Sequence, residues 1–229
     1  MFLPLLLAAV VGYLLGALPF GWLISRKFGI NIFEHGSKNP GATNVKRVLG
    51  EKFGKRGKRA GDLAFALDAL KGAAAAGWPL WYARYTEFAF TVGPNGASFT
   101  WFDASHAPAM AITGLVFALV GHSFSCWTRF KGGKGVATTA GGLLVLLPLP
   151  TVFAVIAWIA TFYASRYVSL ASIVSAVVLP LSAWLVPGVP CAFAILATVV
   201  CSFVILRHRA NIARLLNGTE NKFAKKPAA

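Results

Sequence analysis

The sequence is poor in acidic residues. It holds only 7 Asp and Glu against 22 Lys and Arg among 229 residues, which gives a formal net charge of +15. No stretch contains enough carboxylates to hold Mg²⁺ or Zn²⁺, so we expect neither a metal centre nor a cofactor. Cysteine is also scarce. Cys126, Cys191 and Cys201 are odd in number and widely spaced, which predicts neither a disulfide framework nor a metal-ligand cluster.

Two common catalytic patterns for acyl transfer are missing as well. None of the histidines (His35, His106, His122 and His208) is followed by Asp five positions later, which excludes the His-x4-Asp pattern of common lipid acyltransferases. No G-x-S-x-G nucleophile elbow occurs. A basic chain without a metal site or an obvious protein nucleophile suits two anionic substrates that react directly with each other. Catalysis would then depend on positioning and charge stabilisation.

Apolar residues make up 57% of the chain. Recurrent apolar runs predict an all-α integral membrane protein of about seven transmembrane helices, forming one domain over residues 1–229. The fourth and fifth runs are short and are separated by "PLP" (148–150), which predicts a tight turn; two full spans and a shallow hairpin both fit. The expected spans are 2–25, 61–83, 108–125, 136–148, 151–165, 169–187 and 190–206.

The basic residues indicate an orientation. Because Lys and Arg are enriched in cytoplasmic loops, their distribution predicts an N-terminus outside and a C-terminus in the cytoplasm. The run 52–61 is interpreted as a lipid-headgroup contact and the aromatic-rich segment 84–107 as an outer interfacial hairpin. Most of the 22 Lys and Arg lie at 26–60, 122–135, 166 and 207–229.

A polar segment, "GSKNPGATNVKR" (36–47), follows the first apolar span. Its glycines and asparagines tolerate positive φ, which lets successive backbone N–H groups point into one concavity. Hydroxyl and amide side chains add donors, and an arginine adds a planar charged fork. We interpret the segment as a phosphate cradle, with a solvated turn as the alternative. Its candidate residues are Ser37, Asn39, Gly41, Thr43, Asn44 and Arg47.

A second polar segment, "FKGGKGVAT" (130–138), places three glycines and two lysines directly before an apolar run. An anion at a helix N-terminus gains from free N–H groups and from the helix dipole, and glycines permit close approach. The spacing is not that of a nucleotide P-loop. A phosphate site and a flexible basic anchor both fit this pattern. Its candidate residues are Lys131, Gly132, Gly133, Lys134 and Gly135.

A third segment, "RHRANIARLLNGTE" (207–220), follows the last span. On one continuous helix its polar residues share an arc of about 120°, which fits either a site or an amphipathic surface helix. These residues are Arg207, His208, Asn211 and Arg214. Ser169 and Ser172 lie at the inner end of the sixth span.

Ionisable residues also occur near or inside the spans. Asp68 and Lys71 lie three apart within the second span, where such groups are costly unless paired, so we expect an ion pair that faces the bundle. His122, in "GHSF", lies at the inner end of the third span, next to the glycine–lysine segment.

Taken together, the motifs resemble the bacterial membrane acyl-phosphate:glycerol-3-phosphate acyltransferase family in order and spacing, over nearly the whole chain. They are "GSKNPGATNVKRVLG", "GHSFSCWTRFKGGKGVAT", "SLASI" and "RHRANIARLLNGTE", with "DALKG" (68–72) as a further element. Lys38 departs from the pattern, since the family often has a small residue there. The resemblance implies a seven-helix protein of the bacterial cytoplasmic membrane with its active site facing the cytoplasm.

The same resemblance implies a reaction. An acyl group passes from acyl phosphate to the 1-hydroxyl of sn-glycerol 3-phosphate, which gives 1-acylglycerol 3-phosphate and inorganic phosphate without an acyl-enzyme. This is the first acylation of phospholipid biosynthesis. The implied partners are these two substrates, membrane lipids and, transiently, an enzyme that produces acyl phosphate; nucleic acid is not among them.

The family's site residues map onto the three motifs. Phosphate contacts map to the candidates of the first two motifs, and the catalytic group comprises His208, Asn211, Ser169, Lys134 and Arg47. Ser169 is chosen over Ser172 for the serine element. Either His208 or a substrate phosphate oxygen takes the proton, and the sequence does not separate these two.

Two other classes of function fit parts of the pattern. An anion transporter or channel explains the basic face, but it should carry several ionisable groups near the midplane and inverted repeats. Only Asp68 and Lys71 meet the first condition, and no repeat is visible. A membrane-anchored nucleic-acid binder requires aromatic residues within its basic runs, which are lacking. We therefore expect an enzyme.

Overall fold

The computed structural model describes residues 2–92 and 103–223, and within these ranges it contains helices and no strand. The chain forms two compact units, residues 1–146 and 147–229. The first unit contains α1 (Phe2–Ala17), α2 (Phe20–Lys27), α3 (Ala42–Val92), α4 (Ala107–Ser123) and α5 (Val136–Leu146), with short 3₁₀ turns at Ala104–His106 and Cys126–Thr128. The second contains α6 (Pro148–Ser165), α7 (Val168–Leu185), α8 (Cys191–Arg207) and α9 (Arg209–Leu216).

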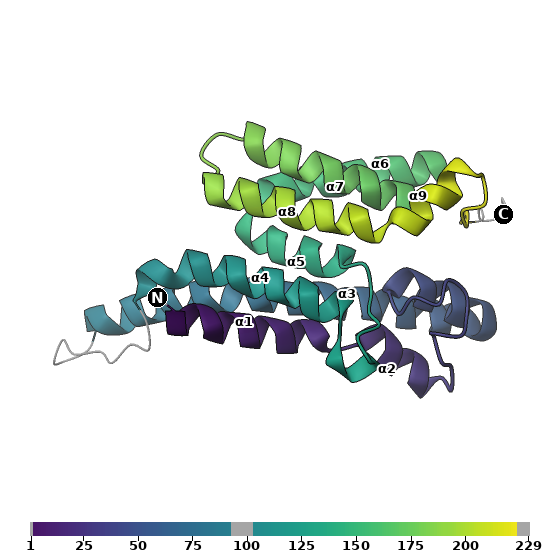
Figure 1. The fold of residues 1–229 in the computed structure, drawn as a ribbon, viewed down its shortest axis with the longest axis horizontal. Helices are drawn as coiled ribbons and strands as arrows, with labels where there is room; N and C mark the ends of the chain where they lie inside the picture. The colour runs from purple at the N-terminus through teal and green to yellow at the C-terminus, as the bar shows by residue number, and fades with distance from the viewer. Residues whose placement is uncertain (1, 93–102, 224–229) are drawn as a thin grey trace. The chain divides into compact units, whose positions relative to one another are not determined.

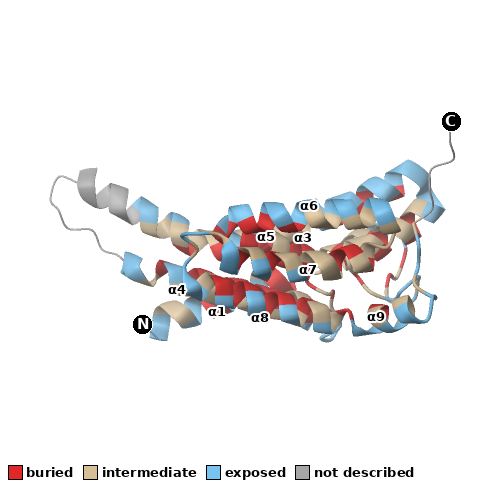
Figure 2. Ribbon diagram, turned by 90° about the horizontal axis from the view of Figure 1, so that it is seen from above, coloured by how far each residue is buried: buried red, intermediate tan, exposed pale blue. Residues whose placement is uncertain are grey.

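In the first unit α1 packs along α4, and α3 packs against both α4 and α5 (Figure 1). Small residues make the α1–α4 approach close. A Cβ on Gly12 would lie 2.3 Å from the carbonyl oxygen of Gly114, and one on Gly16 would lie 2.0 Å from that of Ala118. Such contacts between small residues are typical of helices that associate in a membrane. Buried residues follow these facing surfaces, while other faces are exposed (Figure 2).

The first apolar run forms one candidate membrane span, Phe2–Lys27, as expected for 2–25. Within it the helix is interrupted at Leu18 and Pro19, which lie between α1 and α2. Proline lacks a backbone N–H and so cannot continue the hydrogen-bond ladder of a helix. The break leaves the carbonyl of Leu18 as an acceptor for the Lys71 ammonium, at 2.8 Å.

The basic run at 52–61 is part of a helical hairpin. α3 is interrupted at Phe53 and Gly54, and Gly54 has φ +56° and ψ −132°. The two limbs then lie close together: a Cβ on Gly57 would be 1.9 Å from the carbonyl oxygen of Leu49. Lys46 and Asp62 pair across the hairpin. This run therefore has a structural role in addition to the predicted headgroup contact.

A small apolar cluster packs against the first polar motif. Its buried members come from the segment before the motif, from the motif itself, from the residues directly after it and from the second limb of the α3 hairpin: Ile30, Ile32, Val45, Val48, Leu49 and Ala60. Trp22, Ile24, Phe28 and Phe33 pack against them. Burying such side chains contributes roughly 1.5–3 kcal/mol for each large one, and this burial stabilises the fold of the motif.

In the second unit α7 contacts both α6 and α8 (Figure 1). Side chains also join these helices: the Ser175 hydroxyl donates to the carbonyl of Ala154 at 2.9 Å, and the Trp184 indole donates to Thr198 Oγ1 at 3.1 Å. The polar arc considered for Arg207, His208, Asn211 and Arg214 assumed that they lie on one helix, and the structure divides them between two. α8 and α9 are bent by 57°, with His208 between them, and α9 ends at Leu216.

Among the described residues, four helical stretches are long and apolar enough to cross a membrane, or five if the bent pair α8–α9 counts as one. The integral-membrane, all-helical class is thus supported, while seven spans, the orientation and the single domain stay predictions. α5 is a short apolar helix of 11 residues. Only Leu147 lies between α5 and α6. Pro148 and Pro150 belong to the first turn of α6, so the break between the two helices lies at residue 147 rather than at 148–150.

The predicted outer hairpin at 84–107 is corrected in part. α3 continues through Val92, so the first residues of that segment are helical. Residues 93–102 lie outside the described ranges.

Candidate active site

The first motif folds around Asn44. The Asn44 side-chain amide donates to the carbonyls of His35 and Asn39, both at 3.0 Å, and its Oδ1 accepts the backbone N–H of Ser37 at 3.0 Å. Asn39 Oδ1 in turn accepts the N–H of Gly41 at 2.8 Å. Asn44 is 3% exposed. The two asparagines thus shape the turn through their side-chain hydrogen bonds. The sequence predicted instead that they adopt positive φ and donate to phosphate, but neither Asn39 nor Asn44 has a positive φ.

Two positions of this turn have a left-handed backbone. Gly36 has φ +57°, and a Cβ there would lie 2.3 Å from Asn44 Oδ1, so glycine is required for both reasons. Lys38 has φ +56° although it carries a side chain. For such a residue this conformation costs about 1–2 kcal/mol. The turn is therefore held by its hydrogen bonds against local strain.

The second half of the motif is helical rather than a loop. α3 begins at Ala42, so Thr43 and Arg47 lie in its first two turns and are half-buried, while Ser37 is exposed on the preceding turn. The first N–H groups of a helix have no partner within the helix, and the helix dipole favours an anion there. The motif is thus a glycine-containing turn that leads into a helix N-terminus, which is a known arrangement for phosphate.

The glycine–lysine loop, residues 130–135, is held by hydrogen bonds at Lys131 and Gly133. The N–H of Gly133 donates to the carbonyl of His122 at 3.1 Å, and the Thr128 hydroxyl donates to the carbonyl of Lys131 at 2.6 Å. Gly135 has φ +87° and directly precedes α5. The loop therefore leads into a second helix N-terminus.

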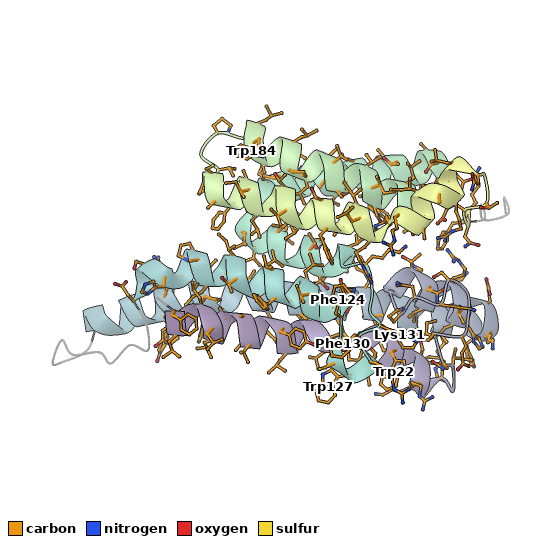
Figure 3. The ribbon with its side chains drawn as sticks, in the orientation of Figure 1. Trp22, Phe124, Trp127, Phe130, Lys131 and Trp184 are labelled. Atoms are coloured by element: carbon orange, nitrogen blue, oxygen red, sulfur yellow. The ribbon has the colours of Figure 1, made fainter. Side chains whose placement is uncertain are left out.

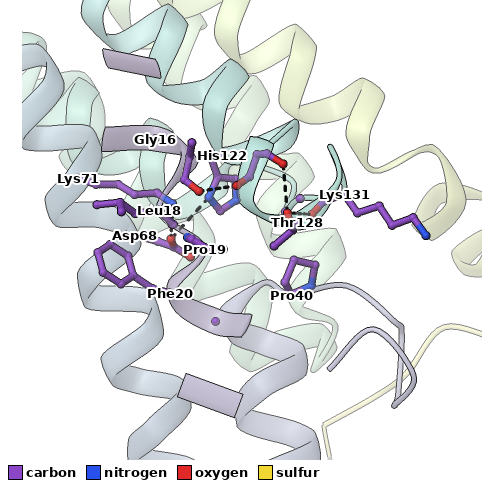
Figure 4. A pocket seen from close by; sticks show the side chains of 15 residues that line it. Gly16, Leu18, Pro19, Phe20, Pro40, Asp68, Lys71, His122, Thr128 and Lys131 are labelled. Atoms are coloured by element: carbon purple, nitrogen blue, oxygen red, sulfur yellow. Dashed lines mark hydrogen bonds and ion pairs between the residues drawn. The ribbon is translucent and has the colours of Figure 1, made fainter. Parts of the chain in front are cut away.

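These two motifs lie side by side. The Asn39 side-chain amide donates to the carbonyl of Gly132 at 3.4 Å, across 93 positions of sequence. Lys134 is half-buried, whereas Lys131 is exposed and its side chain points away from the cavity in Figure 4. The structure thus brings together two donor-rich helix N-termini within one unit.

Behind the loop lies a buried group of three ionisable residues, which we call the Asp68 group: Asp68, Lys71 and His122. The Lys71 ammonium is 2.7 Å from Asp68 Oδ1, and His122 Nδ1 is 3.6 Å from the same oxygen (Figure 4). The predicted ion pair between Asp68 and Lys71 is confirmed, and both side chains are buried. Together with the glycine–lysine loop the group lines a small cavity.

Exposed aromatic residues flank the same loop. Phe124 and Trp127 come just before it and Phe130 is its first residue, while the half-buried Trp22 belongs to α2 (Figure 3). Trp127 and Phe130 are 63% and 64% exposed. Aromatic residues of this kind are enriched where a membrane meets water.

In the second unit the predicted serine element and the third motif meet at Glu220. Three side chains donate to its carboxylate: Ser169 Oγ at 2.9 Å, Asn211 Nδ2 at 2.8 Å and Arg214 Nε at 2.7 Å. Burial by itself raises the pKa of Glu220, but the hydrogen bonds from Asn211, Ser169 and Arg214 outweigh it, so the pKa lies below the ordinary value. Sequence analysis missed this residue. The sequence pattern that could have indicated it is an isolated acidic residue in a basic tail, two positions after a glycine. In the structure that glycine, Gly218, has φ +70°.

The same contacts separate the two candidate serines. Ser169 reaches the Glu220 carboxylate, whereas Ser172 donates to the carbonyl of Val168 and accepts from the Trp158 indole. Ser172 therefore serves helix packing, and Ser169 shares a hydrogen-bonded group with the third motif.

His208 occupies the bend between α8 and α9 and is 3% exposed. Its Nδ1 lies 2.8 Å from the carbonyl oxygen of Val204. Because a carbonyl oxygen only accepts, Nδ1 carries the proton, and in the neutral ring Nε2 is the basic nitrogen. The tautomer is the one that a general base acting through Nε2 requires.

Comparison with known proteins agrees with these observations. The family model described as glycerol-3-phosphate acyltransferase matches residues 6–218. The chain belongs to this family. Among curated relatives, the glycerol-3-phosphate acyltransferase of Fusobacterium nucleatum is 39% identical over 93% of this chain and 95% of its own length. That of Mesorhizobium japonicum is 40% identical over 97% of both chains.

Solved structures show that the likeness to glycerol-3-phosphate acyltransferases includes the fold. Crystal structures of PlsY, an integral membrane glycerol 3-phosphate acyltransferase, match at 33% identity and cover 96% of this chain. The glycerol 3-phosphate form has a TM-score of 0.77 and covers 96% of that chain; the lysophosphatidic acid form has a TM-score of 0.74 and covers 95%. Family membership decides between the acyltransferase expectation and the transporter and nucleic-acid alternatives.

Proposed function

We propose that this protein transfers an acyl group from acyl phosphate to the 1-hydroxyl of glycerol 3-phosphate. The products are 1-acylglycerol 3-phosphate and inorganic phosphate, as in the first acylation step of phospholipid biosynthesis. The observation that carries the proposal is the whole-chain likeness to a protein solved with glycerol 3-phosphate and with lysophosphatidic acid, an acceptor and its acylated product. The donor is inferred from the site, because two adjoining helix N-termini suit a phosphate leaving group.

Acyl phosphate is a mixed anhydride, so its carbonyl carbon is already activated. The hydroxyl oxygen of glycerol 3-phosphate attacks that carbon, the bond from carbon to the phosphate oxygen breaks, and inorganic phosphate leaves with the electron pair. No acyl-enzyme is needed. The first motif and the glycine–lysine loop hold the donor phosphate and stabilise its growing charge through backbone N–H groups, Arg47 and Lys134.

The third motif serves the acceptor in this scheme. Asn211 and Ser169 orient the glycerol part, with Glu220 holding both side chains. The hydroxyl proton goes either to His208 Nε2 or to a phosphate oxygen of a substrate. The tautomer fixed by Val204 supports the first route.

The location follows from composition and charge. We infer that the protein lies in the bacterial cytoplasmic membrane with its polar motifs facing the cytoplasm, because basic segments stay on that side. The exposed aromatic residues beside the loop then lie at the membrane–water boundary, where an acyl chain enters from the bilayer. An enzyme that produces acyl phosphate is the expected transient partner.

A reconstituted assay tests the reaction. Purified protein in detergent should release phosphate from acyl phosphate and glycerol 3-phosphate, with no acyl-CoA, carrier protein or divalent metal present. Acyl-CoA in place of acyl phosphate serves as the donor control. Activity with acyl-CoA alone, or a strict metal requirement, would disprove the proposed donor chemistry.

Arg47→Ala tests the first motif. Loss of one preorganised charged donor should lower kcat by about 10²- to 10³-fold. Arg59→Ala is the matched control, since Arg59 is an exposed arginine on the other limb of the α3 hairpin. Equal rates for the two variants would remove Arg47 from the mechanism.

A further inference from the structure

The helix α2 and the α3 hairpin carry a dense group of exposed basic side chains. We call it the basic surface, and its members are Arg26, Lys27, Lys52, Lys55, Arg56, Lys58 and Arg59. The stretches that carry these residues hold two acids, Glu51 and Asp62, and Asp62 is paired with Lys46. Several of the cations lie three or four positions apart on one helix, and like charges at this spacing destabilise a helix. The basic surface therefore does not stabilise the helices that carry it.

Two aromatic contacts join parts of this surface that are distant in the sequence. Phe28 directly follows α2, and the centre of its ring lies 5.1 Å from that of Phe53 at the hairpin kink, in an edge-to-face arrangement. The Arg56 guanidinium lies 5.3 Å from the centre of the same Phe28 ring. α2 and α3 are also in contact along their lengths (Figure 1). The end of α2 therefore touches the tip of the hairpin.

On α3 the exposed side changes from basic to apolar within two turns. Arg56, Arg59 and Leu63 follow one another at intervals of three and four, so they share one face of the helix. Leu63 is 52% exposed, and Phe65 is 50% exposed. At 1.5 Å per residue, Arg59 lies about 6 Å from Leu63 along the helix axis. The headgroup layer of one leaflet is about 5–8 Å thick, so a bilayer that covers the apolar residues brings its headgroups to Arg59.

α2 shows the same change over a single turn. Leu23 is 40% exposed, and the exposed Arg26 and Lys27 follow it at three and four positions, on the same face. The Arg26 guanidinium lies 5.8 Å from the centre of the Trp22 ring, and tryptophan is enriched at the membrane–water interface. The candidate membrane span that contains α2 also ends at Lys27. Both helices thus change from apolar to basic toward the end at which Phe28 joins them.

We propose that the basic surface binds the acidic headgroups of the leaflet beside it, and so gathers anionic phospholipid on this side of the protein. A topology signal requires only basic residues in a loop, whereas here two distant segments form one exposed surface. Charge complementarity selects the occupant, because a basic segment next to a membrane is attracted to anionic lipid. The exposed apolar residues next to the cations favour a bilayer over a soluble acidic protein. This inference concerns lipid binding and is independent of the proposed acyl transfer.

Hydrogen exchange of the full-length protein in nanodiscs tests this binding. Discs of phosphatidylcholine are compared with discs of phosphatidylcholine mixed with phosphatidylglycerol. In the mixed discs the amides of 52–61 should exchange at least about five-fold more slowly, which is the effect expected from one basic residue near an acidic membrane surface. High salt should remove the difference, because it screens exposed charges. Equal exchange in the two kinds of disc would overturn the proposal.

A pair of charge-neutralising variants tests which cations are responsible. Lys58→Gln/Arg59→Gln removes the two cations nearest to the apolar part of α3, and should remove most of the difference between the discs. Arg209→Gln/Lys222→Gln is the matched control, because it removes the same charge from exposed residues of the second unit and should keep the full difference. Each difference is taken for one variant in two discs, so a general loss of stability cancels. A difference that persists in the first variant, or is lost equally in the control, would show that the basic surface does not bind the lipid.

The α2 part of the surface is tested at a distance. Arg26→Gln/Lys27→Gln should also reduce the difference measured at 52–61, because Phe28 joins the two parts. An undiminished difference in this variant would contradict a single joined surface. Soluble polyglutamate added to the protein in phosphatidylcholine discs tests the other kind of occupant. Slower exchange with polyglutamate but not with phosphatidylglycerol would overturn lipid binding and assign the surface to an acidic protein.

Discussion

Glu220 offers the most direct test of how the second unit is held together. Its side chain is only 6% exposed, and its carboxylate accepts from Ser169, Asn211 and Arg214. Ser169 and Asn211 are themselves buried. Glu220→Ala removes the acceptor that three donors share: one donor lies on α7 and two lie on α9. The variant should therefore lose stability and, as a consequence, activity.

The magnitude follows from the exposure of each donor. A hydrogen bond to a charged group contributes about 1.5–3 kcal/mol, and this applies to the buried donors of Ser169 and Asn211. Arg214 is 36% exposed, so its ion pair contributes only about 0–1 kcal/mol. The total loss is about 3–7 kcal/mol, which is a large share of the free energy of unfolding of a typical protein, about 5–15 kcal/mol. Glu220→Gln keeps one carbonyl oxygen and should lose less, about 1–3 kcal/mol.

The assay is thermal unfolding in detergent, followed together with acyl transfer. Glu220→Ala should lower the unfolding temperature by about 10 °C or more, with Glu220→Gln between it and the unmodified protein. Glu51→Ala is the control, since Glu51 is an exposed acid on α3. If Glu220→Ala unfolds at the same temperature as Glu51→Ala, the carboxylate does not organise the second unit.

Three further predictions concern pH, packing and topology. Because the folded-state pKa of Glu220 is lowered, the stability that its carboxylate contributes is complete above the unfolded pKa of about 4.3 and is lost as pH falls through the folded pKa. Below about pH 4 the unmodified protein should therefore lose more stability than Glu220→Gln. Unfolding curves that fall in parallel for the two proteins would contradict this. Gly72→Ala should cost about 1–3 kcal/mol, because its Cβ would lie 2.0 Å from the Thr138 carbonyl, whereas Gly77→Ala, with 3.7 Å to its neighbour, should be tolerated in the same unfolding assay. In intact cells an impermeant maleimide should label exposed Cys191 but reach exposed Cys126 only after permeabilisation, and the reverse pattern would disprove the proposed orientation.

Local features of the sequence predicted the class of fold and the residues of each motif. Apolar runs of membrane-spanning length indicate helices in lipid whatever their neighbours are, because an unpaired backbone polar group is costly there. The spacing of Asp68 and Lys71 also sufficed to predict their ion pair, since residues three apart share a helix face. Helix breaks were predicted less well: the sequence analysis did not place those at Pro19, Gly54 and His208, although proline at position 19 is a local signal for one of them.

The sequence by itself thus determined a basic, helical membrane protein with three polar motifs that suit phosphate chemistry. Only the tertiary structure decided that Asn39 donates a hydrogen bond to Gly132 and that the Asn44 side chain bonds within its own turn. The same holds for the hydrogen bonds that Ser169 and Asn211 donate to Glu220. The reason is physical. Periodicity and turn propensity are properties of neighbouring residues, whereas a hydrogen bond across 93 positions exists only after helices have packed and placed both partners at bonding distance.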